Sequence, residues 1–356
     1  MNLTVNSQDL AAELRLLNKI VPTKPVIAIL SHALMTADEA GIRLYATDLE
    51  MALTGPCLGH IDMPGQIAIP VAKLLAIVEQ FPDADVSLTA DRQQVGIRCG
   101  AYSSKLQAMP TDDFPTPPEA AGQTVTIDAS ALRQLIAKTR HALNASGAKH
   151  VLKGALLTFV GPAAAMVATD GQRLSLATAA RAGIDLDVII PAKALDVLAG
   201  GAEEGDVALT VGDRHLFFAS GGRLLTSRKL EGRFPAYDRI IPRENDKLIE
   251  ADRAAWIAAL RRVILTAEET SAVYLNVAAN EMGMASASVG IGSGQESIAV
   301  GYAGEDLKAR INGAYLLDFL NAATGPTVTL ALKDAQGHAL LTDGDHLGVV
   351  ALMRVK

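Results

Sequence analysis

Few residues of this chain have the types and spacing that chemistry on a substrate requires. The segment Thr169-Asp170-Gly171-Gln172-Arg173-Leu174 holds a carboxylate and a guanidinium three residues apart, and Glu231 adds an acid further along. Gathered in a cleft, these groups could transfer protons. No converging cluster is visible around them, so an α+β enzyme with a site at Asp170 and Arg173 is a minor alternative. The competing interpretation is an ordinary turn held by the Asp side chain.

The histidines and glycines give no sign of a metal or nucleotide site. The seven histidines contain no His-x-x-x-His or Glu-x-x-His spacing, and the chain has neither a Walker loop nor a G-x-S-x-G elbow. The run Gly290-Ile291-Gly292-Ser293-Gly294 is similar to a dinucleotide-binding loop, but the strand-like segment ESIAV follows it where a helix is needed. We therefore predict a hairpin turn there, and a protein without catalysis, metal or cofactor.

Composition favours a cytoplasmic protein of several small domains. A chain of 356 residues corresponds to about two or three domains. Hydrophobic residues make up 49% and aromatic residues only 4%, so the cores must consist of Leu, Ile, Val and Ala. No run approaches the ~18 apolar residues of a membrane span, and the segment MNLTVNSQDL lacks the basic start of a signal peptide. Cys57 and Cys99 fit a reducing cytosol and are expected to be buried small hydrophobes.

The chain repeats itself with a period of about 122 residues. Four features recur in one register: Ala46-Thr47-Asp48 with Ala168-Thr169-Asp170, Val5 with Ile127 and Ile249, Pro70 with Pro191 and Asn312, and Phe114-Pro115 with Phe234-Pro235. This period is too long for a solenoid unit and fits a small domain. We therefore predict three tandem domains, at residues 1–120, 124–243 and 246–356.

Each copy has the same order of expected elements. A short strand leads to a cap residue (Ser7; Asp128 or Ser130; Asp252) and then to a helix with one apolar stripe. Strands follow, then a step from strand to helix at Pro70, Pro191 or Asn312, then further strands. Each domain is therefore predicted to be an α+β unit with an internal pseudo-twofold, in which two helices pack against antiparallel sheets.

Charge is distributed unevenly between the helices and the rest of the chain. The net charge is −7, yet the first helices of the second and third copies carry only basic residues, namely Arg133, Lys138 and Arg140, and Arg253, Arg261 and Arg262. Solvated helix faces would explain any single helix. An acidic body with basic equivalent helices would instead hold a polyanion loosely and without reading its sequence.

The order of motifs resembles the bacterial sliding clamp family, the beta subunit of DNA polymerase III. The matching pieces extend from end to end of the chain: Lys24-Pro25 with Ile29-Leu30, Thr47 to Glu50, Pro110 to Pro115, Ala168 to Leu174, Glu231 to Pro242, Asn312 to Asn321 and Val349 to Val355. The combination of ATDG-x-RL with GRFP-x-Y-x-R is specific, whereas neither motif alone would be.

The resemblance implies a head-to-tail homodimer whose six domains form a closed ring around duplex DNA. Such a processivity factor tethers DNA polymerase III subunits, meets the clamp loader and other proteins with a clamp-binding motif, and has no membrane partner. The residues implied to contact DNA are Lys24, Arg133, Arg140, Lys149 and His150. The residues implied to form the dimer interface are Lys73, Leu106, Ile264 and Leu265.

The resemblance also implies a partner-peptide pocket between the second and third domains, with an apolar interior and Arg173 and Arg239 towards its rim. Fourteen residues match: Leu152, Thr169, Gly171, Gln172, Arg173, Leu174, Pro235, Arg239, Ile240, Asn312, Tyr315, Val350, Met353 and Arg354. The chain departs from the family at Gln172, where a His is familiar, at Ala351-Leu352, where Met-Pro is usual, at Thr270, where some members place an aromatic residue, and at the extra Lys356.

These departures motivate one further alternative, a specialised extra clamp copy whose pocket is altered to resist an inhibitor. The missing proline is also expected to loosen the tail strand, because proline fixes φ.

Overall fold

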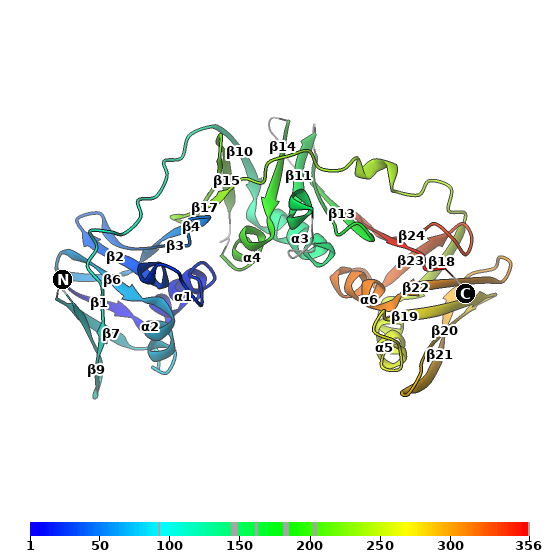
Figure 1. Cartoon of the computed structure of the whole chain (residues 1–356), viewed down its shortest axis with the longest axis horizontal. Helices are drawn as coiled ribbons and strands as arrows, with labels where there is room; N and C mark the ends of the chain where they lie inside the picture. Colours follow the sequence, from blue (N-terminus) through cyan, green and yellow to red (C-terminus); the bar gives the residue numbers. More distant parts are fainter. Residues whose placement is uncertain (92, 144–148, 161–162, 181–184, 202–204, 355–356) are drawn as a thin grey trace. The chain divides into compact units, whose positions relative to one another are not determined.

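Each copy begins, as its sequence pattern predicts, with a strand that runs directly into a helix. These pairs are β1 (Asn2–Asn6) with α1 (Ser7–Asn18), β10 (Gln123–Asp128) with α3 (Ala129–Thr139), and β18 (Lys247–Asp252) with α5 (Arg253–Ile264) (Figure 1). The computed structural model describes residues 1–91, 93–143, 149–160, 163–180, 185–201 and 205–354. Lys356 therefore lies outside the described residues.

The first helices are held by capping side chains, of which one differs from the prediction. The cap of α1 is Asn6, whose side-chain oxygen accepts from the backbone N–H groups of Gln8 and Asp9, at 2.8 and 3.3 Å. Ser7, the predicted cap, instead donates its hydroxyl to the carbonyl of Pro82. Asp252 caps α5 as predicted, because it accepts from the N–H of Ala255 at 2.7 Å.

The second step from strand to helix is also present in all three copies. The pairs are β6 (Gly65–Pro70) with α2 (Val71–Val78), β14 (Leu186–Pro191) with α4 (Ala192–Gly201), and β22 (Leu307–Asn312) with α6 (Gly313–Ala322). Within one copy the two helices pack against each other, α1 with α2 and α5 with α6 (Figure 1). This arrangement confirms the α+β class and the predicted pair of helices.

The remaining elements are mostly strands. In the first copy they are β2 (His32–Asp38), β3 (Gly41–Thr47), β4 (Met51–Cys57), β5 (Gly59–Met63), β7 (Asp85–Ala90), β8 (Gln94–Cys99) and β9 (Tyr102–Gln107). In the second they are β11 (Gly154–Val160), β12 (Ala163–Thr169), β13 (Arg173–Ala180), β15 (Asp206–Val211), β16 (His215–Ser220) and β17 (Arg223–Arg228). In the third they are β19 (Ala272–Ala278), β20 (Glu281–Ser288), β21 (Gly292–Gly301), β23 (Thr327–Leu332), β24 (His338–Asp343) and β25 (His346–Ala351).

Four short 3-10 helices complete the described structure, at Ala28–Ser31 (η1), Arg140–Ala142 (η2), His150–Lys153 (η3) and Tyr237–Arg239 (η4). The glycine run at Gly290 lies at the turn between the paired strands β20 and β21. The predicted hairpin is therefore confirmed.

The chain forms two compact units, residues 1–130 with 193–229 (the first unit) and residues 131–192 with 230–356 (the second unit). The first unit contains a five-stranded sheet, β5-β1-β7-β8-β9, and an eight-stranded sheet, β10-β15-β16-β17-β4-β3-β2-β6. The second contains a twelve-stranded sheet, β14-β11-β12-β13-β25-β24-β23-β18-β21-β20-β19-β22. All pairings within these sheets are antiparallel.

One strand pair in each unit joins successive copies of the repeat. In the first unit β17 pairs with β4, so that Leu225 faces Leu53. In the second unit β25 pairs with β13, so that Leu347 faces Leu176. We call these places the first and second junctions. Each junction continues a sheet from one copy into the next, which protects strand edges that would otherwise be open.

The repeat extends to individual hydrogen bonds. At the end of β3, Asp48 accepts from the N–H groups of the residues two and three positions later, and Thr47 accepts from the residue two positions later. At the end of β12, Asp170 and Thr169 make the same bonds. The residue after each Asp has a positive φ, 75° at Leu49 and 93° at Gly171. The predicted turn held by an Asp side chain is therefore present twice.

The cores are aliphatic, as the composition requires. The core of the third copy surrounds Trp256 and Phe319 with Leu, Ile, Val and Met side chains. Cys57 is buried as predicted, and burial together with Glu13 and Asp9 raises the pKa of its thiol to about 12. Cys99 is only half-buried, so the prediction for this residue was wrong. It occupies the last position of β8, beside a hairpin turn.

Candidate functional site

An apolar cluster at the second junction contains two of the candidate pocket residues. Its buried members are Leu152, Leu156, Val167, Leu174, Ile189, Phe234 and Val349. Leu152 is 7% exposed and Leu174 3% exposed. Phe234 precedes the half-buried Pro235, so the repeated Phe-Pro pair anchors the end of the second copy in this cluster. These side chains supply an apolar floor, and most of their area is already covered by the protein itself.

Arg173 lies inside the second junction, not at a rim. Its Nε donates to Asp170 at 3.0 Å, its Nη1 to Asp318 at 2.6 Å and its Nη2 to the carbonyl of His141 at 2.5 Å. Its guanidinium lies over the ring of Tyr315, 4.2 Å from the centroid. Only 12% of the side chain is exposed. The expectation of a rim position is therefore wrong for Arg173, because carboxylates from two elements and an aromatic face hold it inward.

Asn312 and Tyr315 lie at the start of α6. The side chain of Asn312 accepts from the N–H of Tyr315 at 3.1 Å and caps the helix. Tyr315 is half-buried, and burial and the nearby Asp170 raise the pKa of its phenol, an effect that Arg173 opposes. The resemblance connected these residues with a ligand, and the structure gives both of them a local structural contact as well.

The C-terminal segment is tied down by its backbone. Val350 is buried in β25 opposite Arg173. The N–H groups of Ala351, Leu352 and Met353 donate to the carbonyls of Gln172, Gly337 and Arg310, at 3.0, 2.9 and 2.7 Å. A proline in place of Leu352 would have no N–H to donate to Gly337. The hydrogen bond from Leu352 thus opposes the loosening expected from the missing proline, and that loosening stays a prediction.

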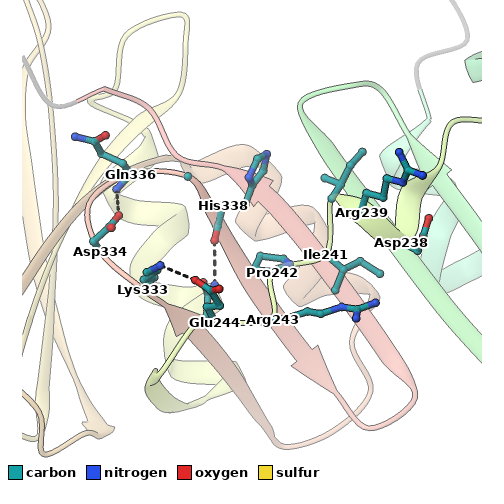
Figure 2. A pocket seen from close by; sticks show the side chains of 13 residues that line it. Asp238, Arg239, Ile241, Pro242, Arg243, Glu244, Lys333, Asp334, Gln336 and His338 are labelled. Carbon is teal, nitrogen blue, oxygen red and sulfur yellow. Dashed lines mark hydrogen bonds and ion pairs between the residues drawn. The ribbon is translucent and has the colours of Figure 1, made fainter.

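A polar cavity of about 760 Å³ lies beside this tail, between the linker 238–245 and the turn 333–338 (Figure 2). Asn245 joins the two segments by donating to the carbonyls of Ala331 and His338, at 2.8 and 3.0 Å. Glu244 and Lys333 form an ion pair across it, at 2.6 Å. We call it the linker cavity. Two candidate pocket residues, Arg239 and Ile240, line its wall.

Arg239 is exposed, as expected for a rim residue, and Ile240 is 37% exposed.

The remaining candidates differ in exposure. At the repeated turn, Gly171 and Gln172 are exposed and Thr169 is buried beneath them. In the tail, Met353 is half-buried and Arg354 is exposed. The fourteen candidates thus all belong to the second unit. They divide between the apolar cluster, the repeated turn with α6, the tail and the linker cavity.

Sequence reasoning did not identify Asp318, His141 and His346, which support these groups from behind. Asp318 holds Arg173, and His346 stacks on Phe319 of α6 at 4.3 Å between ring centroids. Asp318 could have been found from its spacing. It follows Tyr315 by three residues, and this spacing places both side chains on one face of α6. The histidines gave no signal, because their partners come from distant parts of the chain.

The residues expected to contact DNA differ in how they are presented. Lys24, Lys149 and His150 are exposed, whereas Arg133 and Arg140 are half-buried. Lys138, which contributed to the basic pattern of the second copy, is 6% exposed and pairs with Asp345 at 2.5 Å. On α5, Arg253 donates to the carbonyls of Gly325 and Leu320, and Arg262 pairs with Glu296. The basic pattern therefore combines surface charges with internal structural ones.

The residues expected at the dimer interface lie on α2, β9 and the end of α5. Lys73 is exposed and Leu106 half-buried. Ile264 packs partly against the core of the third copy, and Leu265 is 76% exposed. Within the described ranges, no group of three or more His, Cys, Asp or Glu side chains is arranged to hold a metal. No helix of the described chain is long and apolar enough to cross a membrane.

Comparison with known proteins gives a consistent result. The models of the N-terminal, central and C-terminal domains of the DNA polymerase III beta subunit match residues 1–118, 126–236 and 238–353. The beta sliding clamp of Pseudomonas putida is 32% identical over 368 residues and covers 100% of both chains. The beta sliding clamp of Caulobacter vibrioides is 31% identical over 98% of each.

Solved structures agree over the whole chain. A sliding clamp (DNA polymerase III subunit beta) from Pseudomonas aeruginosa, bound to griselimycin, is 29% identical with a TM-score of 0.92 and 100% coverage of both chains. The DNA polymerase III beta subunit of Thermotoga maritima, at 21% identity, a TM-score of 0.93 and the same coverage, supports the fold alone. Together with the full-length relatives, these matches show that the chain belongs to the bacterial beta sliding clamp family, the beta subunit of DNA polymerase III.

Proposed function

We propose that this protein is a processivity clamp, which encircles duplex DNA as a head-to-tail homodimer and tethers the replicative polymerase and other partners to it. The full-length match to beta sliding clamps carries the proposal. This function requires no covalent chemistry. We therefore propose a non-catalytic subunit, and we propose that it acts in the cytoplasm, where its DNA polymerase partners would be. Its domains are residues 1–120, 124–243 and 246–356.

The strand edges support the ring. Each junction pairs the last strand of one copy, β17 or β25, with the strand that follows the first hairpin of the copy before it, β4 or β13. In the repeat, β9 corresponds to β17 and β25, and β21 corresponds to β4 and β13. Within the described chain, no such pairing is made by β9 or by the Gly292–Ser297 part of β21. Among the described strands, neither has a neighbour on its outer edge. Pairing β9 of one protomer with β21 of another would close both edges, and a head-to-tail contact made twice closes a ring.

The proposed interface includes Lys73, Leu106, Ile264 and Leu265. Of these residues, Leu265 is the most accessible hydrophobic one, because it is 76% exposed at the end of α5 and open to contact with a second protomer. The proposed DNA contacts are Lys24, Arg133, Arg140, Lys149 and His150. Such contacts reach phosphates without reading bases, which leaves the ring free to slide.

The proposed partner site is the set of fourteen pocket residues in the second unit. The buried floor at Leu152 and Leu174, together with the partly covered Met353 and Ile240, suits the apolar anchor of a short extended peptide. DNA polymerase III subunits, the clamp loader and other proteins with a clamp-binding motif are the proposed partners. The comparisons favour neither the specialised copy with an altered pocket nor an enzyme at Asp170 and Arg173.

Retention on DNA tests the proposed function. After loading onto nicked circular DNA, the protein should remain bound through moderate salt and dissociate when the circle is cut once. The same protein on linear DNA with blocked ends should remain bound, because the blocks prevent it from sliding off. Equal loss from circular and open linear DNA as salt rises would identify ordinary electrostatic binding and would contradict the clamp.

A further inference from the structure

Arg173 has little capacity left to bind a ligand directly. Three of its nitrogens already donate to Asp170, Asp318 and the carbonyl of His141, and one face of its guanidinium covers Tyr315. These contacts join the repeated turn before β13, the middle residue of η2 and the middle of α6. We call this arrangement the arginine bridge. Its geometry fixes the turn at Gly171 and the ring of Tyr315, both of which belong to the proposed partner site.

The first junction contains a counterpart of this arrangement. At this junction the later of the two copies supplies the cation, whereas at the second junction the earlier copy supplies it. There, Nζ of Lys193 on α4 contacts the carboxylate of Asp48 and donates to the carbonyl of Ile20, the latter at 2.8 Å. Asp48 is the repeat equivalent of Asp170, and Ile20 lies one residue from the equivalent of His141. We call this arrangement the lysine bridge. It joins the corresponding turn to the segment after α1 and to the first turn of α4, and within the described part of the chain no contact places Lys193 over an aromatic ring.

A second ion pair at each junction shows the same reversal. Arg223 of β17 pairs with Glu13 of α1 in the first unit. In the second unit Lys138 of α3 pairs with Asp345 just before β25, and position 345 follows position 223 by one repeat of 122. The earlier copy thus supplies the acids at the first junction and the bases at the second. In these ion pairs the signs of the charges on the earlier and the later copy are exchanged between the two junctions. This exchange disfavours pairing of the wrong copies.

This reversal places an arginine at the partner site, and the arginine needs an anion from α6 to hold it. Asp170 is on the same turn as Arg173 and cannot position it relative to α6. Asp318 is the α6 carboxylate that contacts it, at 2.6 Å, and 44% of that side chain remains exposed. We propose that Asp318 is a positioning residue of the partner site, which acts through Arg173 to align the turn 169–174 with Tyr315. This inference rests on the proposed function, since it concerns the peptide that the pocket would bind.

The test measures binding of a synthetic peptide with a Gln and a Leu-Phe anchor pair to the full-length protein, by titration calorimetry. Asp318→Asn should weaken binding by about tenfold or more, as expected for loss of a hydrogen bond between charged groups. Asp318→Glu keeps the carboxylate and should restore most of the affinity. Asp48→Asn is the matched control, because it removes the carboxylate that holds the cation of the lysine bridge, and it should leave peptide affinity unchanged.

A double-mutant cycle shows whether Asp318 acts through Arg173. With Arg173→Met as background, adding Asp318→Asn should have little further effect on peptide affinity. Additive losses would mean that Asp318 contacts the peptide itself and would overturn the inference. Thermal unfolding of each variant separates positioning from stability: a purely structural role would lower the unfolding temperature of the Asp318→Asn and Asp48→Asn variants while changing peptide affinity in neither.

The wild-type protein distinguishes the two levels of failure. If it does not bind the peptide at all, the proposed partner site is wrong. If it binds, and the Asp318→Asn variant binds equally well, the partner site stands and the positioning role of Asp318 is wrong.

Discussion

Ser175 and His346 share a buried hydrogen bond of 2.9 Å in which the imidazole is the donor. The hydroxyl proton of Ser175 is already donated to the carbonyl of Lys138, at 2.8 Å, so Nε2 of His346 must supply the proton between them. Nδ1 of His346 is then an unprotonated nitrogen, and it has no partner among the described residues. The second junction is thus built around a neutral histidine.

The neutral histidines predict a stability that falls at acid pH. Burial and then Lys138 lower the pKa of His346 to about 4, although Asp343 and Asp345 oppose the effect of Lys138, and burial and then Arg173 lower the pKa of His141 to about 3. Both values lie below the ordinary 6.5, so the unfolded chain binds protons that the folded chain does not. The contribution of these histidines to the free energy of unfolding should be fully present above pH 6.5 and be lost as the pH falls towards 4. For His346 the loss is roughly 3 kcal/mol.

Chemical denaturation at a series of pH values measures this loss. His346→Gln keeps a donor towards Ser175 and removes the titration, so its stability should depend less on pH between 6.5 and 4. His338→Gln, at an exposed position outside the junction, is the control and should keep the wild-type slope. Identical slopes for the wild type and His346→Gln would show that this histidine is not the source.

The Glu13–Arg223 pair should be strongly coupled, because both side chains are largely buried, at 7% and 17% exposed. Glu13→Lys should cost about 3–5 kcal/mol of unfolding free energy, since it leaves Arg223 facing a like charge. The double variant Glu13→Lys, Arg223→Glu should recover part of this loss. Arg15→Glu breaks the exposed pair with Glu79 and should cost only about 1 kcal/mol or less. If Glu13→Lys and Arg15→Glu lowered the free energy of unfolding equally, burial would not be what makes the Glu13–Arg223 pair strong.

Leu265→Asp should convert the proposed dimer into monomers without unfolding them, because this leucine is exposed in the single chain. Replacing Ile264 and Leu265 together by Ala should also open the interface. Ile264 packs against the core, however, so that variant should lose stability as well. Light scattering at micromolar concentration measures the mass. Leu58→Asp, which changes another exposed leucine, should remain dimeric, and a monomeric wild type would refute the ring.

The tail should be weakened by the proline that is usual in the family. Leu352→Pro removes the N–H that donates to Gly337 at 2.9 Å, and should cost about 1 kcal/mol or more of unfolding free energy. Because the tail lies beside the proposed pocket, peptide affinity should change too. Leu352→Ala keeps the N–H and serves as the control for loss of the side chain. Unchanged urea unfolding of Leu352→Pro relative to Leu352→Ala would show that the bond contributes nothing.

The sequence by itself determined the features that depend on short-range pattern. The repeat of about 122 residues, the strand-to-helix steps at Pro70 and Asn312, and the turn held by Asp170 were all visible, because each is specified by neighbouring residues. The α+β class followed from the same patterns. Even the misplaced cap at Ser7 was wrong by one residue only, since Asn6 has an equally suitable side chain.

The fate of the charged side chains was decided only by the tertiary structure. Lys138 was expected to be a surface charge and Arg173 a rim residue, yet in the second junction Lys138 is buried and the side chain of Arg173 is only 12% exposed. Their partners lie far along the chain: Asp345 is 207 residues from Lys138, and Asp318 is 145 residues from Arg173. A charged side chain is buried only where it pairs with an opposite charge. This pairing depends on how β25 and α6 pack against the second copy, which no local sequence pattern encodes.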